Sequence, residues 1–390
     1  MDMKEGTGRQ ALTAPAALPS SPPRVIAAGM ADSVIARRGP GGLEWRWEDG
    51  ILAAAIDRAG RAIGGWAHCG WAARAIGGLV DAGGSISGWR DSNSDLRLLQ
   101  PGVVLASLYR DTGEERFRRA LASLLTSLRR HPRSRSGGFW SSRSRPFQMW
   151  LDCTGAPFHA LALGALGEPE ALDDAVHQLL VMEECARDPR TGLPSHAWDE
   201  SRRQLWSNPE SGRSPCAWTR GIGLFLSAAV DTLEALPPGH QGWQALAGMI
   251  GRLAASLVRW QDAASGLWFQ VTDQPLQEGN YLEGSGTCLL SYAFARAGRL
   301  GCLPEPSFQA AACRAFDGAA ARCISEDRDG RYALSGCSPN VILGGTPYRD
   351  GTFACYTRAA SVVDDPVGTA GFILAALERD DAGVRARAAS

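Results

Sequence analysis

The stretch Asp262-Ala263-Ala264-Ser265-Gly266-Leu267-Trp268 decides the fold, because variants of it recur along the chain. The Asp opens such a turn by accepting hydrogen bonds from the backbone that follows, and the Gly supplies the positive φ that closes it. Related connectors stand at residues 111–113, 188–193 and 327–330. Short extended pieces follow the connectors that begin at Asp188, Asp262 and Asp327; these pieces are residues 194–199, 268–272 and 331–335. We therefore predict a repeating unit of roughly 60 residues, made of a helix pair, a turn and a small hairpin.

Long segments rich in Ala and Leu surround these connectors and carry apolar residues at helical spacing, as at Leu121, Leu124, Leu125 and Leu128. We expect helices at about residues 50–81, 101–130, 155–186, 219–236, 241–260, 283–300, 306–323 and 365–380. No alternation of strand and helix with a phosphate-binding glycine turn occurs, which argues against a Rossmann fold. The predicted fold is all-α, a closed toroid of helical hairpins whose connectors gather at one end as a concave face.

The domain organisation follows from where this pattern starts and stops. Residues 1–40 are rich in Pro, Ala, Ser and Gly without a sustained apolar period, so we expect a disordered lead. Residues 41–380 are expected to form a single catalytic domain, and residues 381–390 a C-terminal tail.

Composition and charge exclude several classes of function. The 390 residues carry 40 basic and 41 acidic side chains, so no overall field favours nucleic acid or an anionic membrane as a partner. Lys4 is the single lysine of the chain, which excludes a Schiff-base lysine in the core and a phosphate-binding Gly-Lys loop. No apolar run is long enough to span a membrane.

The ten cysteines lie far apart, with no Cys-x-x-Cys pair. Neither they nor the six histidines show the spacing of metal ligands, so we expect no metal. The N-terminus lacks a basic region followed by an apolar core, and reduced thiols in a cytoplasmic protein are the favoured interpretation.

The loops predicted to line the concave face carry many tryptophans: Trp45, Trp47, Trp89, Trp140, Trp150, Trp198, Trp206, Trp218 and Trp268. A sugar presents apolar ring faces bordered by hydroxyls, and its site combines aromatic platforms with Asp, Arg, His and Asn. The competing interpretation is that most of these indoles belong to the core.

Two acidic residues precede predicted helices. Asp152 lies among large apolar neighbours, where desolvation would raise its pKa and keep it protonated, as a general acid requires. Asp95, paired with Asp152, would position a water or hold a sugar hydroxyl, and two carboxylates are also the signature of ordinary glycoside hydrolysis. For both residues the alternative is a helix N-cap.

A histidine and an arginine complete the candidate set. His196 follows the second connector, where it would donate to a substrate oxygen, unless it is a structural histidine bonded to backbone. Arg220 lies in Trp218-Thr219-Arg220-Gly221 at the start of a helix, and its fork of donors suits a carboxylate. The alternative is an Arg that pairs with an Asp to seal the barrel.

Five short motifs occur in order along the chain: residues 132–140, 148–152 (Gln-Met-Trp-Leu-Asp), 218–221 (Trp-Thr-Arg-Gly), 281–286 (Tyr-Leu-Glu-Gly-Ser-Gly) and 348–351 (Tyr-Arg-Asp-Gly). Together they resemble the unsaturated rhamnogalacturonyl hydrolases, glycoside hydrolases of family 105, which are related to the unsaturated glucuronyl hydrolases of family 88. The resemblance implies an (α/α)6 barrel that uses no cofactor. It also implies removal of a 4,5-unsaturated uronic acid from the non-reducing end of pectin oligosaccharides.

In that chemistry an aspartic acid protonates the enol ether, water adds at C5 and the resulting hemiketal opens. The resemblance implies that Asp152 is the general acid and base. It places Asp95, His196, Trp218 and Arg220 at positions that contact the sugar, and we add Trp47 and Trp140 as aromatic candidates.

Three departures from the family pattern concern the sugar-facing loops. Ser141-Ser142 stand where the family usually has His-Lys, Cys153-Thr154-Gly155-Ala156 where it has Gly-Leu-Tyr-Met, and Ile222-Gly223-Leu224 where it has Asn-Gly-Trp. All three enlarge or depolarise the site. The alternatives to the unsaturated uronyl hydrolase are therefore a weak or inactive sugar-binding homologue and an ordinary glycosidase that uses Asp95 and Asp152.

Overall fold

The computed structural model describes residues 21–90, 95–168 and 172–388, and most of these residues are helical. Six helices form an inner ring: α2(Trp47–Ile63), α4(Gly102–Thr112), α6(Ala156–Leu166), α8(Thr219–Ala235), α10(Gly284–Arg299) and α13(Pro366–Ala388). Six more alternate with them along the chain and lie outside: α1(Pro23–Arg38), α3(Trp66–Gly77), α5(Glu115–Arg129), α7(Leu172–Ala186), α9(Gly242–Val258) and α11(Pro306–Cys323).

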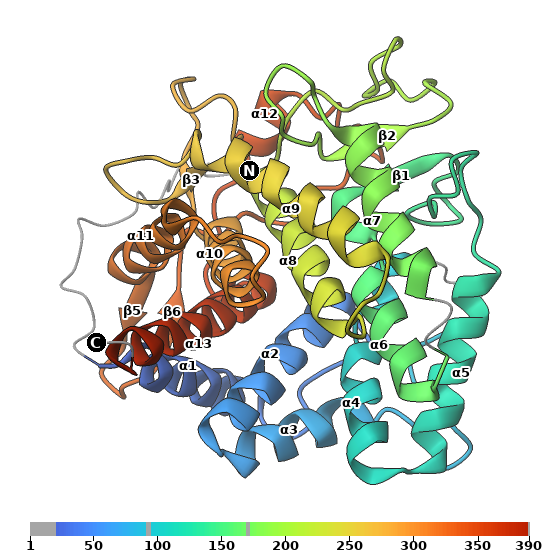
Figure 1. The fold of residues 1–390 in the computed structure, drawn as a ribbon, viewed down its shortest axis with the longest axis vertical. Coiled ribbons are helices and arrows are strands. Elements are labelled where there is room, and N and C mark those ends of the chain that lie inside the picture. Colours follow the sequence, from blue (N-terminus) through green and yellow to red (C-terminus); the bar gives the residue numbers. More distant parts are fainter. Residues whose placement is uncertain (1–20, 91–94, 169–171, 389–390) are drawn as a thin grey trace, which may run out of the picture.

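The inner ring is closed. Each inner helix contacts the next one along the chain, and α13 returns to contact α2. Figure 1 shows the closing contact as the red C-terminal helix lying beside the blue N-terminal helices α1 and α2. This double ring confirms the predicted (α/α)6 barrel.

The N-terminal segment differs from expectation. Residues 1–40 were expected to be disordered, but α1 occupies Pro23–Arg38 and packs against α13 and α2. Ile26, Met30 and Val34 recur every four residues on its buried face. Pro23 stands at the first helical position, where a proline needs no N–H partner. The rest of the expected lead, residues 1–20, lies outside the described residues.

Glycines divide the longer predicted helices into pairs. Gly64 (φ 72°) ends α2, and Gly113 (φ 67°) ends α4, because a left-handed residue terminates a helix. At the other end of the chain, the backbone of α13 continues to Ala388. The boundary expected at residue 380 therefore falls inside a helix rather than before a tail.

Three of the four connectors fold as predicted. The exception is residues 111–113, where Asp111 lies inside α4 and pairs with Arg61, and the turn follows the C-terminal end of that inner helix. The Asp262 carboxylate accepts a hydrogen bond from the Ser265 N–H (2.8 Å), and Gly266 (φ 76°) closes the turn. Asp188 and Asp327 accept equivalent bonds from Arg190 and Asp329, both 2.9 Å.

Short strands accompany the connectors. The predicted extended pieces contain β2(Ala197–Asp199), β3(Trp268–Phe269) and β6(Tyr332–Leu334). Their antiparallel partners are β1(Gln148–Trp150), β4(Leu282–Glu283) and β5(Ile324–Glu326). The pair β1–β2 joins the two ends of the α6–α7 unit, with Met149 opposite Trp198. It thereby brings the segments around residues 150 and 196 together.

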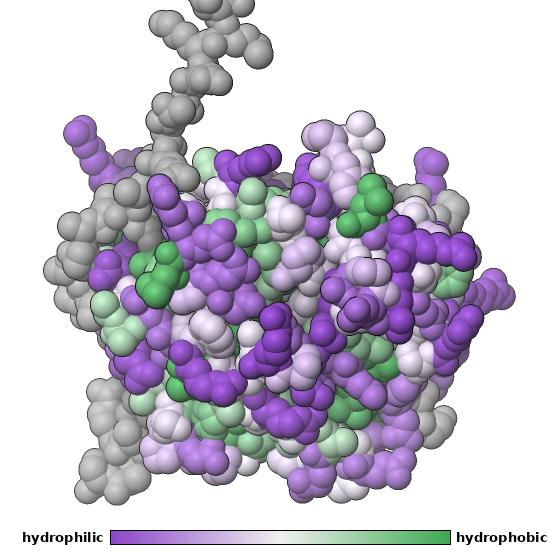
Figure 2. Space-filling model, turned by 90° about the horizontal axis from the view of Figure 1, so that it is seen from above, coloured by the Kyte–Doolittle hydropathy of each residue, from purple (hydrophilic) through white to green (hydrophobic). Residues whose placement is uncertain are grey.

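Figure 2 shows the face that lies at the top of Figure 1, on the side of β1, β2 and β3; hydrophilic residues predominate on it and hydrophobic ones are scattered. Within the described residues, no helix has both the length and the apolar character that crossing a membrane requires.

Candidate active site

The predicted site residues come together at the connector end of the barrel, where the inner helices begin. Trp47 is the first residue of α2, and Arg220 is the second residue of α8. Asp152 lies in the short helix η2(Leu151–Cys153) before α6, and His196 immediately precedes β2. Because each inner helix starts at this end, residues far apart in the sequence share one small volume.

Asp152 occupies the centre of this group, and its side chain is completely buried. Its Oδ1 lies 3.7 Å from Nε2 of His196, slightly beyond hydrogen-bond distance, and its Oδ2 lies 3.5 Å from Nη1 of Arg97. The N-cap of α6 is Gly155, and that helix has no side-chain cap, so Asp152 is not the capping residue that the alternative interpretation required.

The protonation of Asp152 differs from expectation. Burial raises the pKa of this carboxyl group, as predicted, but the His196 ring and the positive charge of Arg97 outweigh burial. The net effect is a pKa well below the usual value for an aspartate. These surroundings favour the carboxylate form of Asp152. The sequence around Asp152 is apolar, and both compensating groups come from other parts of the chain.

Arg97 is a site residue that the sequence analysis missed. Asp95 caps the helix η1(Leu96–Leu99) by accepting from the Arg97 N–H (3.1 Å), so its capping alternative is correct. The same carboxylate also holds the Arg97 guanidinium through Nε (3.0 Å) and Nη2 (2.8 Å), and Arg145 lies 3.3 Å away. Arg97 thus stands between Asp95 and Asp152. Its position two residues after Asp95 was the only signal in the sequence.

His196 is enclosed by aromatic rings. Its ring centre lies 5.3 Å from that of Trp150 and 4.5 Å from that of Trp218. Its Nδ1 lies 2.9 Å from the hydroxyl of Tyr356, a buried residue of the short helix α12(Phe353–Thr357). The partner of His196 is thus a side chain rather than the backbone. Tyr356 was not predicted, because nothing in the sequence links it to a residue 160 positions away.

Arg220 is also buried and only partly satisfied. Its Nη1 donates to the Ser338 carbonyl and lies 3.0 Å from Oδ2 of Asp365, at the start of α13. The alternative interpretation of an Arg–Asp pair is therefore correct for this nitrogen. The indole N–H of Trp218 donates to the Ser338 hydroxyl (3.2 Å), so Trp218 is a core residue that supports the site.

Trp47 and Trp140 occupy different places. The Trp47 ring has the guanidinium carbons of both Arg97 and Arg220 near it, at 5.4 and 6.0 Å from its centre. Trp140 lies on the neighbouring loop with its ring 4.9 Å from that of Phe147. No contact between Trp140 and Asp152 is present among the described residues.

Several buried polar atoms of this group have no hydrogen-bond partner within the described part of the chain: Arg97 Nη1, Asp152 Oδ2, His196 Nε2, and Nε and Nη2 of Arg220. Buried polar groups are nearly always paired in native proteins. Donors and acceptors left free at one end of a barrel are what a polar ligand would satisfy. The described residues contain no group of three or more His, Cys, Asp or Glu placed to hold a metal.

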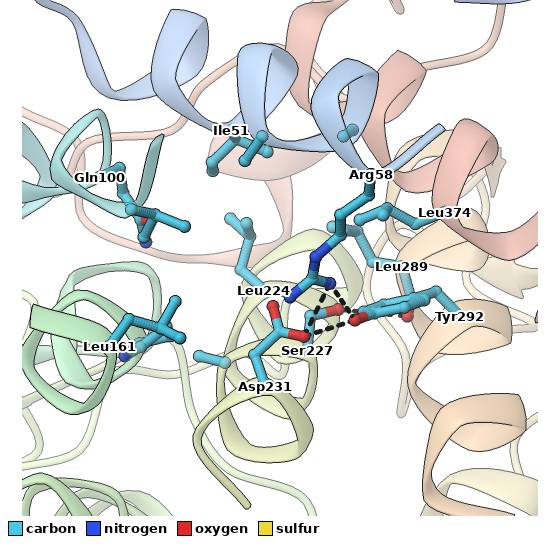
Figure 3. Close-up of a pocket in the computed structure, with 15 residues that line it drawn as sticks. Ile51, Arg58, Gln100, Leu161, Leu224, Ser227, Asp231, Leu289, Tyr292 and Leu374 are labelled. Carbon is cyan, nitrogen blue, oxygen red and sulfur yellow. Dashed lines mark hydrogen bonds and ion pairs between the residues drawn. The ribbon is translucent and has the colours of Figure 1, made fainter. Parts of the chain in front are cut away.

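A layer of apolar side chains separates this group from the barrel interior. Trp47 packs with Leu289 and Val367, and Leu224 packs against the same cluster. An axial cavity of about 70 Å³ is lined by all six inner helices and includes Leu224 and Leu289. Figure 3 shows its polar side, where Asp231 accepts from Arg58 (3.0 Å) and from Tyr292.

The profile of Glycosyl Hydrolase Family 88 matches residues 30–382. The chain belongs to glycosyl hydrolase family 88. A solved glycoside hydrolase of family 105 from C. acetobutylicum ATCC 824 is 34% identical, covers 91% of this chain and 99% of its own, and superposes with a TM-score of 0.87. The resemblance to these two families is thus confirmed.

Two further proteins are similar to the chain, one in fold and one in sequence. The unsaturated glucuronyl hydrolase from Bacillus sp. GL1 shares the fold, with a TM-score of 0.67 at 14% identity over 90% of this chain and 94% of its own. Protein Atu3128 of Agrobacterium fabrum is 36% identical over 229 residues, which are 57% of this chain and 97% of that protein.

The departures from the family pattern have distinct surroundings in this family 88 chain. Ser141 is buried and its hydroxyl is unpaired among the described residues, whereas Ser142 bonds to Ser144 (2.9 Å). Gly155 (φ 63°) supports the turn into α6. Leu224 lies on the axial cavity, where a tryptophan would fill far more volume. The replacement of a large aromatic residue by Leu224 thus falls next to open space.

Proposed function

We propose that this glycoside hydrolase removes a 4,5-unsaturated galacturonic acid from the non-reducing end of rhamnogalacturonan oligosaccharides by hydrating the C4=C5 enol ether. The observation that carries the proposal is the buried group of unpaired polar atoms on Asp152, His196, Arg97 and Arg220. An acid and base, a polar partner for it and two cations with free N–H groups are the chemistry that an unsaturated uronate requires.

In the proposed reaction Asp152, in its protonated form, gives its proton to C4 of the double bond. The resulting carboxylate accepts a proton from the water that attacks C5, so Asp152 ends the cycle protonated. The hemiketal formed at C5 then opens and releases the neighbouring sugar. His196, held by Tyr356 through Nδ1, presents Nε2 toward Asp152 and the reacting atoms.

The geometry gives little support to a two-carboxylate glycosidase. Asp95 is engaged by both Arg97 and Arg145, and Arg97 separates it from Asp152. Both oxygens of Asp95 are thus already engaged by hydrogen bonds to these two arginines. We therefore assign Asp95 the role of orienting Arg97.

The test is the ultraviolet absorbance of the conjugated enol ether in unsaturated galacturonyl-rhamnose, followed over time with purified protein. We expect the absorbance to fall with the wild type and not with Asp152→Asn. Asp111→Asn is the matched control, because Asp111 is exposed at the far end of α4 and pairs with Arg61. Its rate should equal that of the wild type.

Absence of any loss, also with unsaturated glucuronyl substrates and at high protein concentration, would overturn the proposal and favour a sugar-binding homologue without activity. Loss of absorbance with glucuronyl substrates alone would support the hydration reaction but show that the substrate is an unsaturated glucuronate rather than a galacturonate. The cytoplasmic location stays a prediction, and fractionation of the cells that produce the protein would test it. This prediction was based on reduced thiols, and all ten cysteines are free in the structure.

A further inference from the structure

Arg97 is the least expected charge at the site. Its side chain is 7% exposed, and it is held on one edge by Asp95, which occupies Nε and Nη2. Arg145 reinforces this carboxylate from the other side while its guanidinium packs 4.7 Å from the centre of the Trp150 ring. The orientation of Arg97 is thus fixed by contacts that leave one nitrogen unused.

The unused nitrogen faces the reacting group. Nη1 of Arg97 has no hydrogen-bond partner among the described residues and lies 3.5 Å from Oδ2 of Asp152, which is also unpaired. A guanidinium this close to a carboxylate without a hydrogen bond has room for a competing acceptor. The Trp47 ring lies beside it, and Arg220 lies beside the same ring with Nε and Nη2 free.

We propose that Arg97 binds the carboxylate of the substrate together with Arg220, and that this carboxylate replaces Asp152 as the anion facing Nη1 of Arg97. The inference rests on the proposed function, because it assumes that the ligand is a uronate. It assigns Arg97 as a binding residue that selects for a charged sugar.

The charge balance supports this exchange. Asp152 is faced by Arg97, His196 and its own neighbour Cys153, while Tyr356 holds His196, and Asp95 and Arg145 stand behind Arg97. The arginines Arg97, Arg145 and Arg220 stand against the carboxylates Asp95, Asp152 and Asp365. A fourth buried carboxyl group, Glu283, lies near Arg220, and burial raises its pKa. A bound uronate adds one negative charge to this buried balance, and protonation of Asp152 removes one. The ligand and the proton that catalysis needs should therefore bind together.

The experiment measures selection for charge without requiring turnover. D-galacturonate and the neutral D-galactose are titrated into the protein by calorimetry near pH 6. We expect galacturonate to bind at least about tenfold more tightly than galactose, since a charge-assisted hydrogen bond is worth about that much. Arg97→Met should lose most of this ratio. Arg97→Lys should lose it as well, because a single ammonium nitrogen held at Asp95 lacks the planar fork that lets the guanidinium bind Asp95 on one edge and the ligand on the other.

Arg145→Met is the matched control, since it also removes an arginine from Asp95 and from a tryptophan ring but has no group facing Asp152. It should keep the ratio. Circular dichroism and thermal unfolding check that each variant is folded, and Arg97→Lys serves if Arg97→Met is not. Retention of the wild-type ratio in the Arg97 variants, or its absence in the wild type, would overturn the inference.

Proton uptake provides a second readout that a merely structural arginine would not change. In buffers with different ionisation enthalpies, wild-type protein should take up close to one proton per galacturonate bound. Arg97→Met should take up clearly less. If the absorbance does not fall but the wild type still binds galacturonate more tightly than galactose, the hydration reaction is refuted. The binding role of Arg97 would then stand.

Discussion

Asp152 shows how strongly residues that are distant in the sequence control the pKa of a single buried carboxyl group. Its apolar neighbours in the sequence predict a protonated acid, yet the structure surrounds it with Arg97 and His196 and lowers its pKa. Burial and the neighbouring groups act in opposite directions on this pKa, and Arg97 and His196 outweigh burial because they lie within 4 Å in a place without bulk water. The free protein must therefore gain a proton before the proposed reaction.

This protonation predicts an unusual pH profile. Because the pKa of Asp152 is lowered, the protonated fraction of this residue is already small near pH 5 and decreases further with each unit of rising pH. The ratio kcat/KM reports ionisation of the free enzyme, so between about pH 5 and pH 7 it should fall by about tenfold per pH unit. The value of kcat, which reports the complex, should begin to fall at a higher pH. A kcat/KM that stays constant up to neutral pH would show that free Asp152 keeps its proton.

The residues of the site were predictable to the extent that motifs carry them. Asp152, His196, Trp218 and Arg220 meet as expected because each belongs to a motif at the start of an inner helix. Tyr356 and Asp365 were not predicted as partners, since their contacts join segments more than 100 residues apart. The spacing of residues in the sequence does not predict such pairs, because they come into contact only when the barrel is closed.

At the scale of elements, the connectors were the most predictable part of the fold. At Asp188, Asp262 and Asp327, Asp and the following Gly determine the turn through local bonds, which need no distant partner. The helix α1 was missed because its Pro and Ala content resembles a linker, and its stability comes from packing on α13 rather than from its own pattern. The pairing of β1 with β2 was missed because it also depends on contacts between segments that are separated in the sequence.

One connector glycine provides a sharp test. A Cβ at Gly266 (φ +76°) would lie 2.3 Å from the Arg314 carbonyl oxygen, whereas a Cβ at Gly239 (φ +80°) would meet nothing within 4 Å. Both Ala substitutions carry the cost of a left-handed backbone. Gly266→Ala should lower the free energy of unfolding by about 1–3 kcal/mol more than Gly239→Ala, because only the former causes a clash. Urea denaturation measures the difference, and equal losses would contradict the steric interpretation.

At the scale of the whole molecule, the closed ring makes the N-terminal helix a structural part of the barrel. Helix α1 covers α13 and α2 at the point where the ring closes. The sequence predicted a closed toroid, and the structure adds that the closure is sealed from outside by the segment expected to be disordered.

Met30 tests this closure. Its side chain is fully buried on α1, so Met30→Ala should lower the free energy of unfolding by about 2–5 kcal/mol. Val25→Ala on the same helix is the control, because Val25 is 54% exposed and should change stability little. Chemical denaturation of both variants measures the losses. A Met30→Ala protein as stable as the control would mean that α1 does not hold the ring.

The contact between α13 and the first two helices also sets a schedule for biosynthesis. Helices α1 and α2 leave the ribosome early, with apolar faces that belong against a segment beginning at Pro366. At roughly 5–20 residues per second these faces wait for tens of seconds before their partner is translated. The carboxylate of Asp365, which holds Arg220, arrives at the same late moment. A nascent chain of this protein therefore keeps these apolar faces uncovered, and Arg220 without its carboxylate partner, until translation has passed the start of α13.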